Sequence, residues 1–148
     1  MNELKIIIKG IFISFHSRFE EIALRETKII TVSSDNADFP SEKYYLVESY
    51  CEDNSCDCRK VMINIIPVSN PKEILATIGY GWESVKFYEE WMFGDKKTAK
   101  ELVGAYLELG GQQSRHSQHF LEIFKTVIDE KYKKTIVRHY ELWKSSKR

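Results

Sequence analysis

All three cysteines of this 148-residue chain lie between positions 51 and 58, and this cluster constrains the fold more than any other feature. They form the pattern Cys51-x4-Cys56-x-Cys58, with Glu, Asp, Asn and Ser between them. Strand-like segments flank the cluster at 44–48 and 59–67, and the second carries a β-branched residue at every second position from its third residue. The pattern predicts that the cysteines occupy the tip of a hairpin-like connection between two strands.

Apolar periodicity divides the chain into a strand-rich first half and a helix-rich second half. Runs bounded by turn residues predict strands at 28–33, 44–48, 59–67 and 74–80. Apolar residues three or four apart predict helices at 83–93, from Asp95 to Gly110, from Ser114 to Ile128, and over about 129–144.

The segment 4–22 is ambiguous. It keeps a helical spacing of apolar residues, and alternation at its beginning also fits a strand. The longer period favours a helix. The chain is therefore expected to form a single α+β domain over residues 1–148, with a small, mostly antiparallel sheet in the N-terminal half packed on a C-terminal helical bundle.

Charge and composition exclude several classes of protein. Lys and Arg number 22 and balance 22 Asp and Glu, so no overall field attracts the chain to nucleic acid or to a membrane surface. The last predicted helix is basic, but its aromatic residues fall on the inward stripe, which favours a solvated helix face over a nucleic-acid surface. The apolar stretch from Leu4 to Phe15 is interrupted by Lys5 and Lys9 and is too short to span a bilayer. A protein partner stays open, and no membrane partner is expected.

Three clustered thiols in a polar turn are the ligand set of a soft-metal site. An odd number of cysteines in one cluster does not make a disulfide framework, and such thiols indicate a reducing, cytoplasmic compartment. Other zinc motifs are excluded because their partners are missing: there is no C-x2-C pair, no H-x-E followed by P-C-x-x-C, and no H-E-x-x-H. We therefore predict one zinc ion bound by Cys51, Cys56 and Cys58. Buried structural cysteines or a disulfide between neighbours would also account for the cluster.

A closed zinc site needs a fourth ligand, and His139 is the predicted one. It follows Tyr132 and Ile136 at helical spacing, so it points inward among apolar residues. An inward neutral imidazole needs partners for its nitrogens; a metal is one such partner and a backbone carbonyl is another. The carboxylates of Glu52 and Asp53 are local alternatives. Ligation by His139 would tie the last helix to the cysteine turn. The remaining histidines are His16, His116 and His119.

Three short motifs of this chain resemble those of a family of small uncharacterised prokaryotic proteins. The similarity covers roughly residues 44–143 and implies a shared metal-binding scaffold, without an activity. The motifs are Tyr50-Cys51-x4-Cys56-Asp57-Cys58-Arg59, Gly79-Tyr80-Gly81-Trp82 and Arg138-His139-Tyr140.

Two functional classes remain. The first is a non-enzymatic binding or interaction module stabilised by zinc, favoured because no set of nucleophile, base and orienting group emerges beyond the cysteines. The second is a zinc-dependent hydrolase with water in the fourth position and Glu48, Glu52 or Asp57 as general base. Three thiolates donate much charge to zinc and weaken its Lewis acidity, so the sequence favours the first class.

Overall fold

The computed structural model describes residues 12–33, 41–53 and 55–146. In these residues six strands form one sheet in the order β1-β3-β4-β5-β6, with β2 also paired to β3, and every pairing is antiparallel. The strands are β1 (Phe12–Ser14), β2 (Lys28–Val32), β3 (Glu42–Cys51), β4 (Lys60–Pro67), β5 (Ala76–Gly81) and β6 (Gly104–Leu107).

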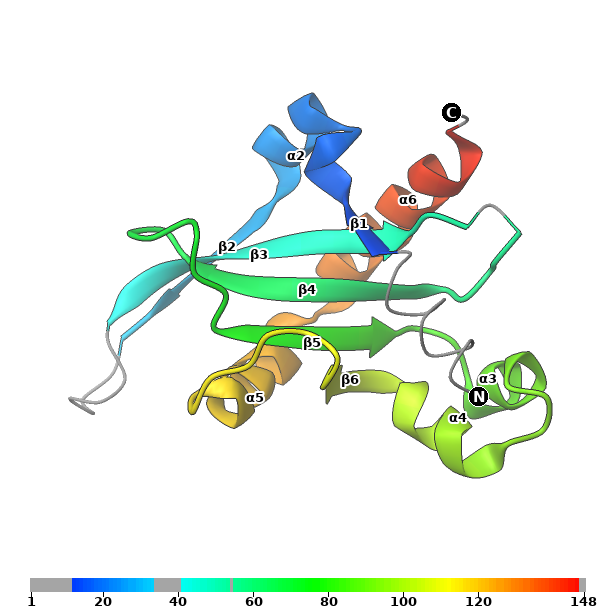
Figure 1. Cartoon of the computed structure of the whole chain (residues 1–148). Helices are drawn as coiled ribbons and strands as arrows, with labels where there is room; N and C mark the ends of the chain where they lie inside the picture. The colour runs from blue at the N-terminus through cyan, green and yellow to red at the C-terminus, as the bar shows by residue number, and fades with distance from the viewer. Residues whose placement is uncertain (1–11, 34–40, 54, 147–148) are drawn as a thin grey trace.

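Helices cover one face of the sheet and flank one of its ends. They are the single-turn η1 (Phe15–Ser17), α2 (Glu20–Glu26), α3 (Val85–Trp91), α4 (Lys96–Leu102), α5 (Ser117–Val127) and α6 (Glu130–Ser145). In Figure 1, α6 runs behind the sheet, α5 lies below β5, and α3 and α4 lie beside the ends of β5 and β6. The predicted α+β class, with an antiparallel sheet in the first half and helices towards the C-terminus, is confirmed.

The core lies between the sheet and the two long C-terminal helices. In β4, the β-branched side chains at alternate positions are fully buried, as the two-residue period of a strand requires. In α6, the aliphatic and aromatic side chains at helical spacing are buried against them. This arrangement holds α6 across the end of β3 that carries Cys51. The residues are Val61, Ile63 and Ile65 of β4 and Tyr132, Ile136, Tyr140 and Trp143 of α6.

The predicted helix over 4–22 does not run through the described part of that segment. Residues 1–11 lie outside the described residues. From Phe12 the chain forms β1, in which Phe12 lies opposite Cys51 of β3, and η1 then leads into α2. Pairing with β3 satisfies the backbone groups of this segment, so the strand prevails over the helical spacing.

The helix predicted from Asp95 to Gly110 is shorter in the structure. Asp95 caps α4 as expected, because its carboxylate accepts a hydrogen bond from the backbone of the third helical residue. The helix stops at Leu102, and Gly104 adopts a φ of 71°, in the left-handed region where helices end. The residues that follow form β6, so one predicted helix is a short helix and an edge strand.

The face of the sheet away from α5 and α6 carries Lys60 and Tyr106. Tyr106 lies opposite Gly79, and a Cβ at Gly79 would collide with the tyrosine ring. Lys60, on the neighbouring strand β4, lies opposite Gly81 of β5. Gly79 therefore leaves room for the Tyr106 ring to lie across this face, and Gly81 lets the Leu102 carbonyl and the Tyr88 ring approach the strand.

Candidate metal centre

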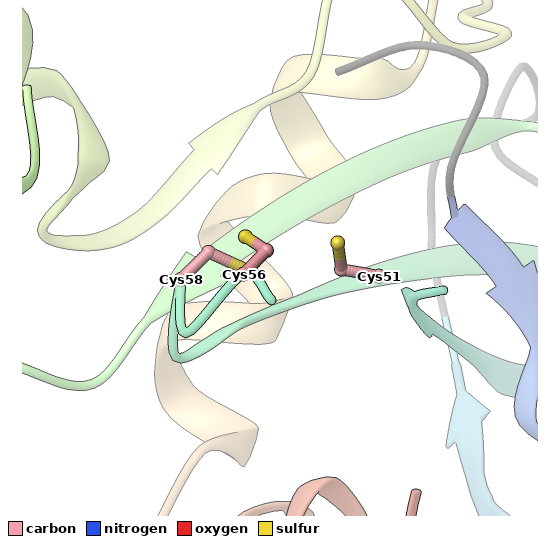
Figure 2. A group of neighbouring side chains, drawn as sticks. All are labelled: Cys51, Cys56 and Cys58. Atoms are coloured by element: carbon pink, nitrogen blue, oxygen red, sulfur yellow. The ribbon is translucent and has the colours of Figure 1, made fainter. Parts of the chain in front are cut away.

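The structure brings the three cysteines together at the end of the sheet. Cys51 is the last residue of β3, and Cys56 and Cys58 lie in the loop that leads back into β4 (Figure 2). Their sulfur atoms all lie within 4.8 Å of one another. Four thiolates around zinc, each about 2.3 Å from it, would be roughly 3.8 Å apart, so only small rotations would close the cluster on one ion. None of the three is in a disulfide.

The environment of the three thiols is uneven. Cys51 and Cys58 are buried, with exposed fractions of 0% and 2%, whereas Cys56 is half-buried. Hydrogen bonding within the cluster lowers the pKa of Cys56 and raises the pKa of Cys51 and of Cys58. One sulfur therefore carries negative charge readily and remains reachable from solvent, as entry of a cation requires.

Local turn chemistry shapes the loop. The Asp53 carboxylate accepts hydrogen bonds from the backbone and the hydroxyl of Ser55, at 2.9 and 2.7 Å, in an Asx-type turn. Arg59 has a φ of 49°, which redirects the chain into β4. Its guanidinium is held by Asp57 at 2.8 Å and by Glu83 at 3.1 Å. The loop conformation is thus fixed at both ends of the cysteine pair.

The last helix braces this loop from the side. The indole Nε1 of Trp143 donates to the carbonyl of Cys51 at 2.8 Å, and the ammonium of Lys144 donates to the same carbonyl at 3.3 Å. The hydroxyl of Tyr140 donates to the Asp57 carboxylate at 2.8 Å. The sequence predicted a tie between the last helix and the cysteine turn through a shared metal ligand. The structure makes this tie through hydrogen bonds to the loop.

His139 is not brought to the cysteines. Its Nδ1 lies 2.7 Å from the Glu48 carboxylate, and its Nε2 lies 2.7 Å from the Glu26 carboxylate. Both ring nitrogens are therefore engaged by carboxylates, whereas a metal ligand needs one of them free. In the described part of the chain, the group of mutually close ligand atoms has three members, Cys51, Cys56 and Cys58.

The two local oxygen alternatives are also outside this group. Glu52 forms an ion pair with Arg18 at 3.7 Å, and Asp53 is engaged by Ser55 within the turn. No fourth protein ligand is thus assembled from the residues that the structure describes.

The partners of His139 form a second polar cluster that the sequence reasoning missed. Glu48, 5% exposed, accepts a further hydrogen bond from the Tyr50 hydroxyl at 2.6 Å. The ring of Phe15 stacks on the imidazole with centroids 4.4 Å apart. A signal was present in the sequence: Glu48 occupies an inward position of a strand whose neighbouring inward residues are aromatic and aliphatic.

Burial opposes the charged form of His139, but hydrogen bonds and charge from Glu48 and Glu26 outweigh it and raise the pKa of the imidazole. The pKa of Glu26 is lowered, first by its hydrogen bond from Arg138 and then by that from His139. A carboxylate at each nitrogen requires a proton on each, so the cluster holds an imidazolium between two carboxylates.

A cleft of about 360 Å³ lies on the same sheet face as Lys60. Ser49 and Met62 line it, and they are an opposed pair two residues from Cys51 and from Lys60. Asn64, Thr77 and Glu108 give it a partly polar wall. The cleft therefore lies along this face of the sheet and reaches to within two residues of Cys51.

Comparison of the chain with protein-family models, with curated proteins and with solved structures finds no match. The resemblance drawn from the short sequence motifs stays a prediction. In the described residues, no helix is both long and apolar enough to cross a membrane.

Proposed function

We propose that this protein binds one zinc ion through Cys51, Cys56 and Cys58, and that the ion is structural. The observation that carries the proposal is the convergence of three thiols, two of them buried, at a loop whose conformation is fixed by α6. A divalent, thiophilic ion such as zinc suits three sulfurs at this separation. The ion would join the end of β3 to the beginning of β4 and would stabilise a non-enzymatic binding module in a reducing compartment.

The fourth coordination position in this proposal is taken by solvent. Ligation by His139 would break its two 2.7 Å contacts and leave Glu48 buried without its partner. Cys56 is half-buried, so water reaches the cluster on its side.

An open coordination position on the same face of the sheet as a cleft is the feature that would favour a zinc-dependent hydrolase. The carboxylates argue against this second class. Each of the three predicted general bases is already held by a cation or an imidazole: Glu48 by His139, Glu52 by Arg18, and Asp57 by Arg59. Three thiolates also leave zinc a weak Lewis acid. The structural role is therefore the better proposal.

Metal analysis of protein purified without added metal tests the proposal. We expect one zinc per chain, and loss of zinc in Cys51→Ser, Cys56→Ser and Cys58→Ser. At zinc concentrations about 1,000-fold above Kd, binding adds roughly 4 kcal/mol, so a chelator should lower Tm by about 10 °C. Glu52→Gln is the matched control in the same loop and should keep full zinc content. Well under one zinc per chain, or a disulfide within the cluster, would contradict the proposal.

A further inference from the structure

Lys60 lies next to the cysteine cluster from two directions. It follows Cys58 by two residues, and continuing the β3–β4 register beyond the pair Ser49–Met62 places it opposite Cys51. Opposed residues of an antiparallel pair project from the same face of the sheet. The Lys60 side chain therefore projects from the sheet face that also carries Cys51, at the end of the sheet where the three sulfurs converge.

This lysine is buried, with an exposed fraction of 5%. In the described part of the chain, no carboxylate lies within ion-pair distance of its ammonium group. The ring of Tyr106, 5.6 Å from Nζ, gives a cation–π contact and no negative charge. The charge of Glu108 acts on this ammonium, but only from beyond ion-pair distance. A buried ammonium without a close anion is strongly disfavoured, so its position needs a nearer counter-charge.

The cysteine cluster supplies that counter-charge when it holds a divalent metal. Three thiolates around one divalent cation leave a single negative charge, and a neutral fourth ligand does not change it. One ammonium group neutralises the assembly. The single positive charge of Lys60 therefore balances the net charge of the proposed site, in which one zinc ion is bound by three thiolates and a solvent molecule.

We propose that Lys60 stabilises the metal centre electrostatically: its buried ammonium group is the counter-charge of the metal–thiolate cluster. This inference rests on the proposed zinc site. It predicts that removing the charge weakens zinc binding but costs the metal-free protein little, because without metal the cluster offers the ammonium no more than the single thiolate of Cys56, which solvent also reaches. A side chain that only fills space would affect both forms alike.

The experiment compares zinc binding and thermal unfolding of the wild type with Lys60→Met, Lys60→Gln and Lys60→Arg. Met keeps the apolar stem and removes the charge, Gln repeats the loss of charge in a polar form, and Arg restores a cation. Lys43→Met, at an exposed position of β3, is the control for losing a lysine from the sheet. Zinc affinity is measured by competition with a chromophoric chelator, and Tm is measured with and without zinc.

We expect Lys60→Met and Lys60→Gln to weaken zinc binding by about 10–100-fold, the usual effect of removing a partner just outside the ligands. We expect Lys60→Arg to recover most of the affinity, and Lys43→Met to match the wild type. The Tm of the metal-free Lys60→Met protein should equal or exceed that of the wild type, and the rise in Tm on adding zinc should be smaller.

Equal zinc affinity in Lys60→Met and the wild type would overturn the role of Lys60 and leave the zinc site standing. The same holds if Lys60→Met lowers Tm equally with and without zinc, because the side chain would then act by packing alone. Absence of zinc binding in the wild type would overturn the proposed function, and the inference about Lys60 would fall with it.

Discussion

At the scale of single residues, His139 shows how one side chain joins three elements. Its imidazole, on α6, lies between Glu48 of β3 and Glu26 of α2 and is stacked under Phe15. The exposed fraction of His139 is 1%, and Glu48 is buried with it, whereas the Glu26 side chain is part-exposed. His139 and Glu48 depend on each other because each would otherwise be a buried polar or charged group without its main partner, whereas Glu26 is part-exposed and is also paired with Arg138.

Replacing His139 by Ala should separate a structural role from metal ligation. The variant leaves Glu48 buried without its main partner, and we expect a loss of about 3 kcal/mol in the free energy of unfolding. Zinc content should stay at the wild-type level. Urea unfolding and metal analysis of the same preparations measure both quantities. Glu48→Gln in the His139→Ala background should recover part of the stability, because it removes the buried charge. A loss of zinc on removing His139 would instead identify it as the fourth ligand.

The same cluster gives a pH dependence with a defined sign. The pKa of His139 is raised above 6.5, so its contribution to stability is complete below 6.5 and is lost as pH rises through the folded-state pKa. The pKa of Glu26 is lowered below 4.5, so its contribution is complete above 4.5 and is lost as pH falls through the folded-state pKa. The difference in unfolding free energy between the wild type and His139→Ala should therefore be largest between these values. A difference that grows steadily towards alkaline pH would contradict this assignment.

At the scale of elements, α6 both closes the core and fixes the cysteine loop. One side of the helix buries its apolar residues against β4, and its last two turns donate hydrogen bonds to the loop from Tyr140, Trp143 and Lys144. The loop has few buried apolar side chains of its own, so its geometry depends on this helix.

Tyr140→Phe tests the brace without disturbing the core. It removes the hydroxyl that donates to Asp57 and accepts from the Arg59 backbone, and we expect a loss of about 1 kcal/mol in stability. Zinc should also dissociate faster, because the ligand loop is less well held. Stopped-flow transfer of zinc to a chelator measures the rate. Glu141→Gln, at an exposed position of the same helix, should leave stability and rate unchanged. If dissociation is equally fast in Tyr140→Phe and the wild type, α6 does not hold the loop.

Sequence periodicity predicts some elements and misses others for physical reasons. It predicts β4 and α6 because each buries a regular stripe on the same core. It misplaces the end of α4 because the apolar spacing continues through Tyr106, although Gly104 already turns the chain into β6. The burial of His139 is also predicted correctly. Its partners are not, because they lie 91 and 113 residues away on other elements.

At the scale of the molecule, the two faces of the sheet have different contents. One face is covered by α5 and α6 and holds the apolar cluster. The other carries Lys60, Tyr106 and the cleft, next to the end where the cysteines converge. The cysteine cluster was predictable because its members are close in sequence. The charged and polar surroundings were not, because antiparallel pairing and the edge strand β6 assemble them.

The sequence distance between the cysteine loop and its brace sets an order of events as the chain folds. The cysteines are neighbours within a single hairpin, whereas the hydrogen bonds from Tyr140 and Trp143 span 83 and 92 residues. Short loops close quickly at little entropic cost, and long ones close slowly. On a ribosome, β3, the loop and β4 emerge well before α6. If the proposed zinc site forms, the hairpin is therefore able to bind the ion while the nascent chain is still growing, and α6 packs against the occupied loop afterwards.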